Sequence, residues 1–141
     1  MRDFITGDEN IIDNPDNAPA TAFVIVESKK GYMLLYNKHY KHWELTGGYM
    51  EKGESPKECA IRECKEESNQ HISDLKFFGI AKYTSMNAAI YYAFLTDENT
   101  FIENDEIQDL RWWKPDEEFT EIDIESRKLI TLHIQQPVML P

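Results

Sequence analysis

Three glutamates with helical spacing are the residues in this sequence that are best suited to chemistry. Glu63, Glu66 and Glu67 stand at positions i, i+3 and i+4, so a helix places their carboxylates on one face, with Cβ atoms roughly 5–6 Å apart. These like charges repel one another, and Arg62 relieves only part of that repulsion. A hard divalent cation such as Mg²⁺ takes carboxylate oxygens as ligands and activates water. A solvated helix face is the commoner alternative for such a cluster, so the flanking residues must decide.

The helix that must carry these carboxylates has a clear start signal. Ser55 is a favourable N-cap residue, Pro56 suits the first helical position, and Glu58 completes an S-x-x-E capping box. The sequence therefore predicts a helix from about Pro56 to Ser68.

Fixed spacings connect this helix to the residues before it. The residues that stand at these spacings are Gly48, Glu54, Arg62, Glu63, Glu66 and Glu67. Their arrangement closely resembles the signature of the Nudix hydrolases, G-x5-E-x7-R-E-U-x-E-E-x-G-U, in which U is an aliphatic residue. The agreement in spacing favours a metal site over a solvated helix face.

Four positions depart from the pattern of that family. Cys64 and Gln70 occupy the two aliphatic positions, Asn69 replaces the glycine, and Thr46 stands where many relatives carry proline. Asn is the next-best residue after Gly for a left-handed helix end, so we expect the helix still to end there. Thr46 is expected to reduce the rigidity of the chain before the glycine pair, and the packing of the loop after Gln70 is left open.

The resemblance implies a fold and a reaction. The fold is of the α+β class, a Nudix-type α/β/α sandwich with a mixed β-sheet between helices. The reaction is hydrolysis of a phosphoanhydride bond in a nucleoside diphosphate derivative, either a nucleoside triphosphate or a nucleotide conjugate, by water attacking phosphorus. The cofactor is Mg²⁺, with Mn²⁺ as an alternative. A non-catalytic Nudix-like nucleotide-binding or sensing module is the alternative function, although such a module normally lacks one of the three helical glutamates.

The resemblance also assigns roles to residues in and before the helix. Glu66 and Glu67 are metal ligands, Gly47 contributes its carbonyl oxygen, Glu63 is a ligand or the general base, Arg62 orients Glu63, and Glu54 supports the corner between loop and helix. Family members often recruit a further acid from a distant loop. Glu106 is the choice here because it lies just before a predicted strand, with Glu103 and Asp105 as rivals and a solvated acidic loop as the alternative.

Composition limits the classes of partner. The chain has 141 residues, enough for one domain with a core, and a net charge of −11. This charge argues against a nucleic acid polymer but permits a small nucleotide bound through metal. No apolar run approaches the length of a membrane span, and no secretory signal pattern is present. Cys59 and Cys64 are expected to be reduced packing residues. A soluble cytoplasmic protein is expected, either a monomer or a homodimer.

The remaining elements follow from β-rich and helical patterns. Residues 1–20 predict an N-terminal arm that is either mobile or an edge strand at Phe4–Ile5, and residues 21–141 predict a single Nudix-like hydrolase domain. The predicted strands are Thr21–Glu27, Tyr32–Asn37, Trp43–Thr46, Leu75–Tyr83, a central Ala88–Thr96, and Leu110–Trp113, with a closing helix from Ile122 to about Ile134 capped by Asp123 or Thr120.

Two segments between these elements bear on the cleft. Gly47-Gly48 predicts a tight turn that allows close backbone approach. Lys38–His42 predicts a polar loop containing His39 and His42. Aromatic residues beside these segments are candidates for stacking on a base, although most aromatics belong to cores; they are Tyr36, Trp43, Tyr49 and Tyr83.

Overall fold

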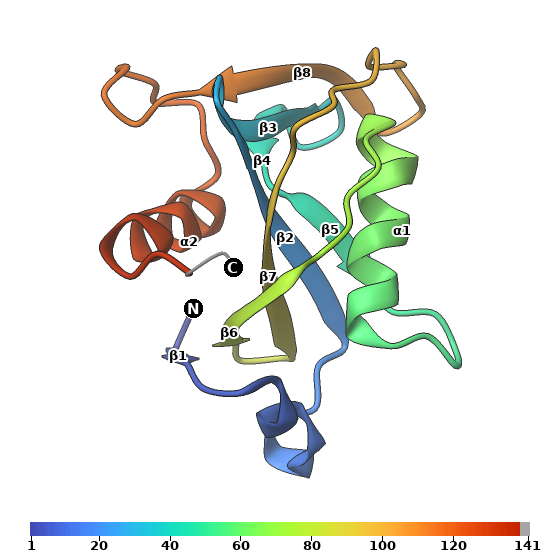
Figure 1. Cartoon of the computed structure of the whole chain (residues 1–141), viewed down its shortest axis with the longest axis vertical. Helices are drawn as coiled ribbons and strands as arrows, with labels where there is room; N and C mark the ends of the chain where they lie inside the picture. Colours follow the sequence, from blue (N-terminus) through green and yellow to red (C-terminus); the bar gives the residue numbers. More distant parts are fainter. Residues whose placement is uncertain (139–141) are drawn as a thin grey trace.

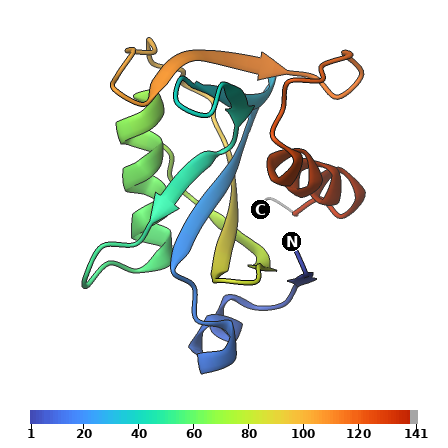
Figure 2. The same cartoon turned by 180° about the vertical axis from the view of Figure 1, so that it is seen from behind.

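One β-sheet runs through the molecule, with one helix on each side of it. The structure, a computed structural model, describes residues 1–138, so the last three residues of the predicted domain lie outside the described residues. In Figures 1 and 2, the first helix and the last helix flank the central strands from opposite sides. The arrangement confirms the predicted α+β class with a mixed sheet between helices.

Within residues 1–138 the sheet contains eight strands, and the two α-helices are both longer than ten residues. The strands are β1 (Asp3–Ile5), β2 (Thr21–Ser28), β3 (Gly31–Asn37), β4 (His42–Glu44), β5 (Thr46–Tyr49), β6 (Lys76–Lys82), β7 (Asn87–Phe94) and β8 (Ile107–Trp113). The helices are α1 (Pro56–Ser68) and α2 (Ile124–Gln135), and two short 3₁₀ turns, η1 (Glu9–Asp13) and η2 (Pro15–Asn17), follow β1.

Strand β2 lies in the interior of the sheet. It pairs in parallel with β7, which confirms the predicted central position of that strand, and antiparallel with β5. It meets β3 only at the hairpin around Lys29 and Lys30, after which β3 pairs with β4 and β8. Because β4 and the start of β8 both pair with the end of β3 at Asn37, and β5 follows β4 directly, these three segments lie close together.

Alternation along β2 divides the core into two clusters. Ala22 and Val24 point to the face covered by α1, whereas Ile25 points to the face covered by α2. On the first face, α1 contributes the small residues Cys59 and Cys64, which are both free and buried, as predicted. Small side chains let α1 lie close to the sheet, and β5 runs beside it (Figure 2).

Several sequence-based expectations were wrong in detail. Gly47 and Gly48 form no tight turn, because they lie inside β5 and pair with β2. His42 belongs to β4 rather than to a loop. The predicted strand Trp43–Thr46 is therefore divided between β4 and β5, with Leu45 between them.

The two ends of the chain match expectation in part. Residues 1–20 contain β1, η1 and η2, and β1 pairs with β6, as the edge-strand alternative predicts. The closing helix begins at Ile124 and is capped by Asp123, while Ile122 forms an isolated bridge with Trp43. Within residues 1–138, neither helix has the length and apolar character needed to cross a bilayer.

Candidate active site

Helix α1 has the boundaries that its caps predict. Ser55 Oγ accepts from the backbone N–H of Glu58 at 3.1 Å, and Glu58 Oε1 accepts from the backbone N–H of Ser55 at 2.9 Å. The helix ends at Asn69, whose φ of 61° lies in the left-handed region that Asn tolerates. Both ends are fixed by neighbouring residues, so the sequence alone determines which side chains share a face.

The glycine pair allows β5 to approach both α1 and β2. A Cβ atom on Gly48 would lie 2.8 Å from the carboxyl carbon of Glu63, and one on Gly47 would lie 2.4 Å from the carbonyl oxygen of Ala22. A side chain at Gly47 would push β5 away from the backbone of β2, whereas one at Gly48 would displace the carboxylate of Glu63. The expected close approach is thus present, although it occurs in a strand.

Three carboxylates from separate elements converge beside this strand. Glu44 comes from β4, Glu67 from α1, and Glu106 from the residue before β8, and one oxygen of each lies within 4.8 Å of the others. Of the loop acids considered from sequence, Glu106 joins this cluster, whereas Glu103 pairs with Lys38 at 3.2 Å. Asp105, the other rival, is exposed like Glu106 but does not belong to the cluster.

Glu67 is the buried member of the cluster, with 4% of its surface exposed. The hydroxyl of Thr46 donates to Glu67 Oε1 at 2.6 Å and the backbone N–H of Gly47 donates to the same oxygen at 3.0 Å. Burial raises the pKa of Glu67 to about 8, and the charges of Glu106 and Glu63 add to this, while the two hydrogen bonds oppose it. Thr46, where many relatives carry proline, therefore supplies a hydrogen bond to the site.

Glu44 was missed by the sequence-based reasoning. Its Oε1 lies 2.7 Å from His42 Nε2, and its Oε2 accepts from Asn37 Nδ2 at 3.2 Å. The same Asn37 nitrogen lies 3.4 Å from Glu106 Oε1, so one amide bridges two carboxylates. Burial raises the pKa of Glu44, and the charge of Glu106 contributes in the same direction. The only signal in the sequence was an acidic residue between Trp43 and Leu45 in a short strand.

Arg62 lies beside the cluster and contacts the other acids of the signature. Its Nε donates to Glu54 Oε2 at 2.6 Å, and its Nη1 donates to Glu63 Oε1 at 2.9 Å and to Glu66 Oε2 at 3.1 Å. The hydrogen bond from Arg62 lowers the pKa of Glu54 to about 2. Nη2 also donates to the carbonyl of Tyr49 at 3.1 Å, so Arg62 fastens the loop before α1 to β5.

The three helical glutamates therefore have different surroundings. Glu67 joins the cluster, and Glu63 is mostly buried between Arg62 and Gly48, where burial raises its pKa. Glu66 has 56% of its side chain exposed and contacts Arg62.

The donor set of the cluster suits a divalent cation. Carboxylate oxygens are the ligands that Mg²⁺ prefers, and those of Glu44, Glu67 and Glu106 carry like charge in a partly buried place. The nearby Arg62 is engaged by Glu54, Glu63 and Glu66. Burial raises the pKa of Glu44 and of Glu67 first, and repulsion among the acids adds to it; a bound cation would offset both effects.

A hollow opens from the cluster toward an apolar wall. Its lining includes Glu44, Glu106, Gly48, Tyr49 and Phe23. A second, more apolar hollow shares Phe23, Gly48 and Tyr49 with it. The residues it adds come from β2, from the connection between β6 and β7, and from α2; they are Thr21, Tyr83, Met86 and Glu125.

The aromatic candidates fall into two pairs. Tyr49 and Tyr83 line the second hollow. Tyr36 and Trp43 instead pack on each other with ring centroids 5.3 Å apart, and Trp43 also packs on Phe119.

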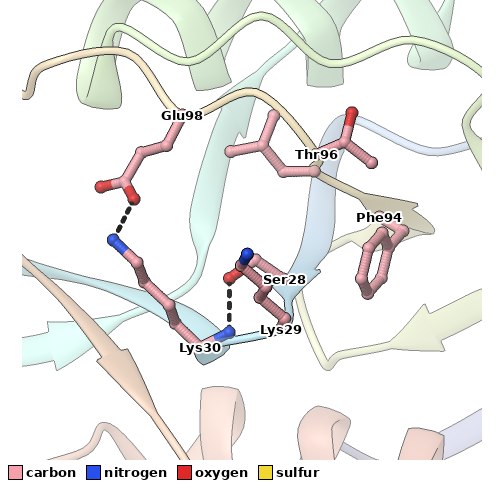
Figure 3. A pocket seen from close by; sticks show the side chains of 7 residues that line it. Ser28, Lys29, Lys30, Phe94, Thr96 and Glu98 are labelled. Atoms are coloured by element: carbon pink, nitrogen blue, oxygen red, sulfur yellow. Dashed lines mark hydrogen bonds and ion pairs between the residues drawn. The ribbon is translucent and has the colours of Figure 1, made fainter.

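Another hollow, at the β2–β3 hairpin, contains none of the signature residues. It lies between the hairpin and the end of β7 and is crossed by the ion pair of Lys30 and Glu98 at 2.8 Å (Figure 3). The exposed Phe94 forms part of its wall. Its chemistry is that of a surface ion pair, so the acidic cluster remains the candidate active site.

Comparisons with known proteins agree with the geometry. The NUDIX domain family model matches residues 16–132. The chain is 27% identical over 97 residues to the NAD-capped RNA hydrolase NudC of Vibrio parahaemolyticus, covering 64% of this chain and 37% of that protein. It is 27% identical over 109 residues to the protein of the same name from Haemophilus influenzae, covering 70% and 41%. The chain thus spans about two-fifths of the length of these curated relatives.

Solved structures show the same fold. A NUDIX-family hydrolase from Clostridium perfringens superposes with a TM-score of 0.72 at 22% identity, covering 86% of this chain and 99% of that one. The pyrophosphohydrolase BsRppH of Bacillus subtilis superposes with a TM-score of 0.69 at 19% identity, covering 94% and 87%.

Proposed function

The chain belongs to the Nudix hydrolase family, and from this premise we propose that it is a Mg²⁺-dependent hydrolase of a phosphoanhydride bond in a nucleoside diphosphate derivative. The observation that carries the proposal is the convergence of Glu44, Glu67 and Glu106 beside the Arg62–Glu63 pair. A binding or sensing module without catalysis is not favoured, because every helical glutamate of the signature is present.

The residues of the site have separable tasks in this proposal. Glu44, Glu67 and Glu106 would hold the metal, with the carbonyl of Gly47 as a further ligand. When bound, the metal neutralises charge on the phosphates and lowers the pKa of water. Mn²⁺ would be accepted by the same oxygen donors.

Glu63 is the proposed proton acceptor. Arg62 fixes one of its oxygens, and burial raises the pKa of its carboxyl group, which brings that pKa closer to the operating pH. Glu54 acts through Arg62 and is a positioning residue. Glu66 would become a metal ligand only after leaving Arg62, so its replacement should reduce the rate less than that of Glu67.

The substrate is proposed to place its nucleoside part toward the apolar hollow of Phe23, Tyr49 and Tyr83, since aromatic faces stack on bases. The relatives are named for NAD-capped RNA, but a net charge of −11 repels a long polyanion. We therefore infer a small nucleotide-type substrate. A cytoplasmic location, and the choice between monomer and homodimer, stay predictions.

A substrate panel with product analysis tests the proposal. Nucleoside triphosphates, nucleotide sugars, dinucleoside polyphosphates, NAD and NAD-capped RNA are incubated with the protein and Mg²⁺. At least one small nucleotide should release phosphate, pyrophosphate or a nucleoside monophosphate, and a chelator should stop the reaction. Preference for the capped RNA would overturn the inference about substrate size.

Two variants make this test specific to the site. Replacing both Glu66 and Glu67 by Gln should abolish turnover, because the buried ligand is lost. Glu118→Gln removes an exposed acid from the loop between β8 and α2 and is the matched control. Wild-type turnover in the double variant would refute the metal assignment.

A further inference from the structure

Gln70 is buried at a position where the family signature has an aliphatic residue. None of its surface is exposed, yet both the nitrogen and the oxygen of its side-chain amide form hydrogen bonds. Its Nε2 donates to the carbonyl of Asn99 at 2.7 Å and to that of Ser68 at 3.2 Å, and its Oε1 accepts from the backbone N–H of Asn99 at 2.8 Å. The side chain thus pairs with both backbone groups of Asn99, as a strand neighbour would.

Two further amides join the same two segments. Asn99 Nδ2 donates to the carbonyl of Asn69 at 3.1 Å, and Asn69 Nδ2 donates to the carbonyl of Thr100 at 2.8 Å. The end of α1 is therefore tied at several points to the loop that follows β7. This loop leads directly to Glu106.

Asn104 connects the helix end to Glu106 itself. Its Nδ2 donates to the carbonyl of Glu67 at 3.0 Å, and its Oδ1 accepts from the backbone N–H groups of Glu106 at 3.1 Å and Ile107 at 2.9 Å. One side chain thus joins the backbone of the buried cluster member, Glu67, to the backbone of the loop member, Glu106.

These contacts also complete the C-terminus of α1. The last four carbonyls of a helix have no partner within it. Here the backbone N–H of Asn69 donates to the carbonyl of Lys65, and Gln70 Nε2 donates to that of Ser68. Asn104 Nδ2 donates to the carbonyl of Glu67 and, at 3.5 Å, to that of Glu66. The loop therefore docks by supplying donors that the helix end requires, which gives the contact a defined geometry.

We propose that Gln70, Asn99 and Asn104 form an amide clamp that positions Glu106 against Glu67 before metal binds, and that the clamp thereby sets the affinity of the site for a divalent cation. The inference rests on the proposed metal site. Its physical reason is that Glu106 and Glu67 belong to separate segments and stay within 4.8 Å of each other only while other contacts hold these segments together; repulsion opposes the approach whenever both carboxyl groups are charged. A loop held in place in advance loses less entropy when the ion binds.

Direct Mn²⁺ binding to the full chain, followed by electron paramagnetic resonance of the free ion, tests the clamp without using activity. Asn104→Ala and Gln70→Leu should each raise the dissociation constant by about 10- to 100-fold, as expected for groups that support metal ligands. Gln70→Leu restores the aliphatic residue of the signature and keeps the core filled, so it serves if Asn104→Ala does not fold.

The matched control is Asn17→Ala. This residue also uses a side-chain amide to bind a loop carbonyl, that of Ile11 at 3.1 Å, but in η2, away from the cluster. It should change Mn²⁺ affinity by less than about twofold. Thermal unfolding in chelator establishes that each variant is folded.

A double-mutant cycle separates positioning from general destabilisation. In a Glu106→Gln background, Asn104→Ala and Gln70→Leu should no longer weaken Mn²⁺ binding, because the ligand they position is already lost. A loss of the same size in both backgrounds would overturn the clamp. Wild-type affinity in Asn104→Ala, with weakened binding in Glu106→Gln, would overturn the clamp and leave the metal site standing. Absence of Mn²⁺ binding to the wild-type chain would overturn both.

Discussion

Helices α1 and α2 cover opposite faces of one sheet and have similar lengths of 13 and 12 residues, but they bury different chemistry. Helix α1 buries small residues and the carboxylate of Glu67. Helix α2 buries Leu129, Ile130 and His133, the last with its ring stacked on Tyr92 at 4.2 Å.

The buried side chains of Glu67 and His133 are stabilised in different ways. Glu67 accepts two hydrogen bonds and lies close to Glu44 and Glu106, so a cation would stabilise its charged form. His133 Nδ1 lies 3.0 Å from the hydroxyl of Tyr32, the rings of Tyr92 and Phe78 surround it, and burial lowers its pKa. A buried group crowded by like charges indicates a ligand site, whereas one enclosed by aromatic rings indicates packing.

The largest effect that separates the two faces should come from Leu129→Ala. Leu129 is 3% exposed in the α2-side core, so its truncation should lower the free energy of unfolding by about 2–5 kcal/mol. Turnover per folded molecule should stay within about twofold, because the three carboxylates of the cluster come from β4, α1 and the residue before β8 rather than from α2. Chemical denaturation together with activity below the transition checks both. A large loss of turnover in the folded variant would mean that the α2 face also shapes the site.

The next largest effect should be a pH-dependent difference in the free energy of unfolding between the metal-free wild type and Glu67→Gln. The folded protein keeps the proton on Glu67 up to about pH 8, whereas the unfolded chain releases it near the ordinary pKa of 4.5. Unfolding therefore releases a proton between these values, and wild-type stability should fall relative to the variant by up to about 1.4 kcal/mol per pH unit as pH rises.

Denaturation curves in chelator between pH 5 and pH 8 measure this difference. Added Mg²⁺ should restore wild-type stability at the alkaline end and have little effect on Glu67→Gln. Parallel stability curves for the two proteins would contradict the assignment of the raised pKa to Glu67.

His133→Phe should have the smallest effect and the opposite sign. Burial lowers the pKa of His133 below 6.5, so near this pH the unfolded chain binds a proton more readily than the folded protein does. Wild-type stability should therefore fall as pH falls through 6.5. The variant should lack this loss, on the order of 1 kcal/mol between pH 7.5 and pH 5.5. Equal acid sensitivity in both proteins would assign the loss to other groups.

The sequence was sufficient wherever interactions are local. Ser55, Glu58 and Asn69 cap α1 through contacts within four residues, so both ends of the helix were predicted. The spacing of Glu63 and Glu67 along one helix fixed their common side, and with Gly48, Glu54 and Arg62 it identified the family. The β-rich runs also located the strands, with most ends within two residues; β8 begins earlier, at Ile107.

The tertiary structure decided which acids meet. Glu44 and Glu106 are far from Glu67 in the chain and reach it only through the register of β3 with β4 and β8. The pairing of β5 with β2 drew Gly47 and Gly48 into a strand rather than a turn. Strand register depends on packing across the whole sheet, and no local pattern records it. The sequence by itself therefore determined the capped helix and its family, whereas the fold determined the partners of Glu67 and the clamp that holds Glu106 beside it.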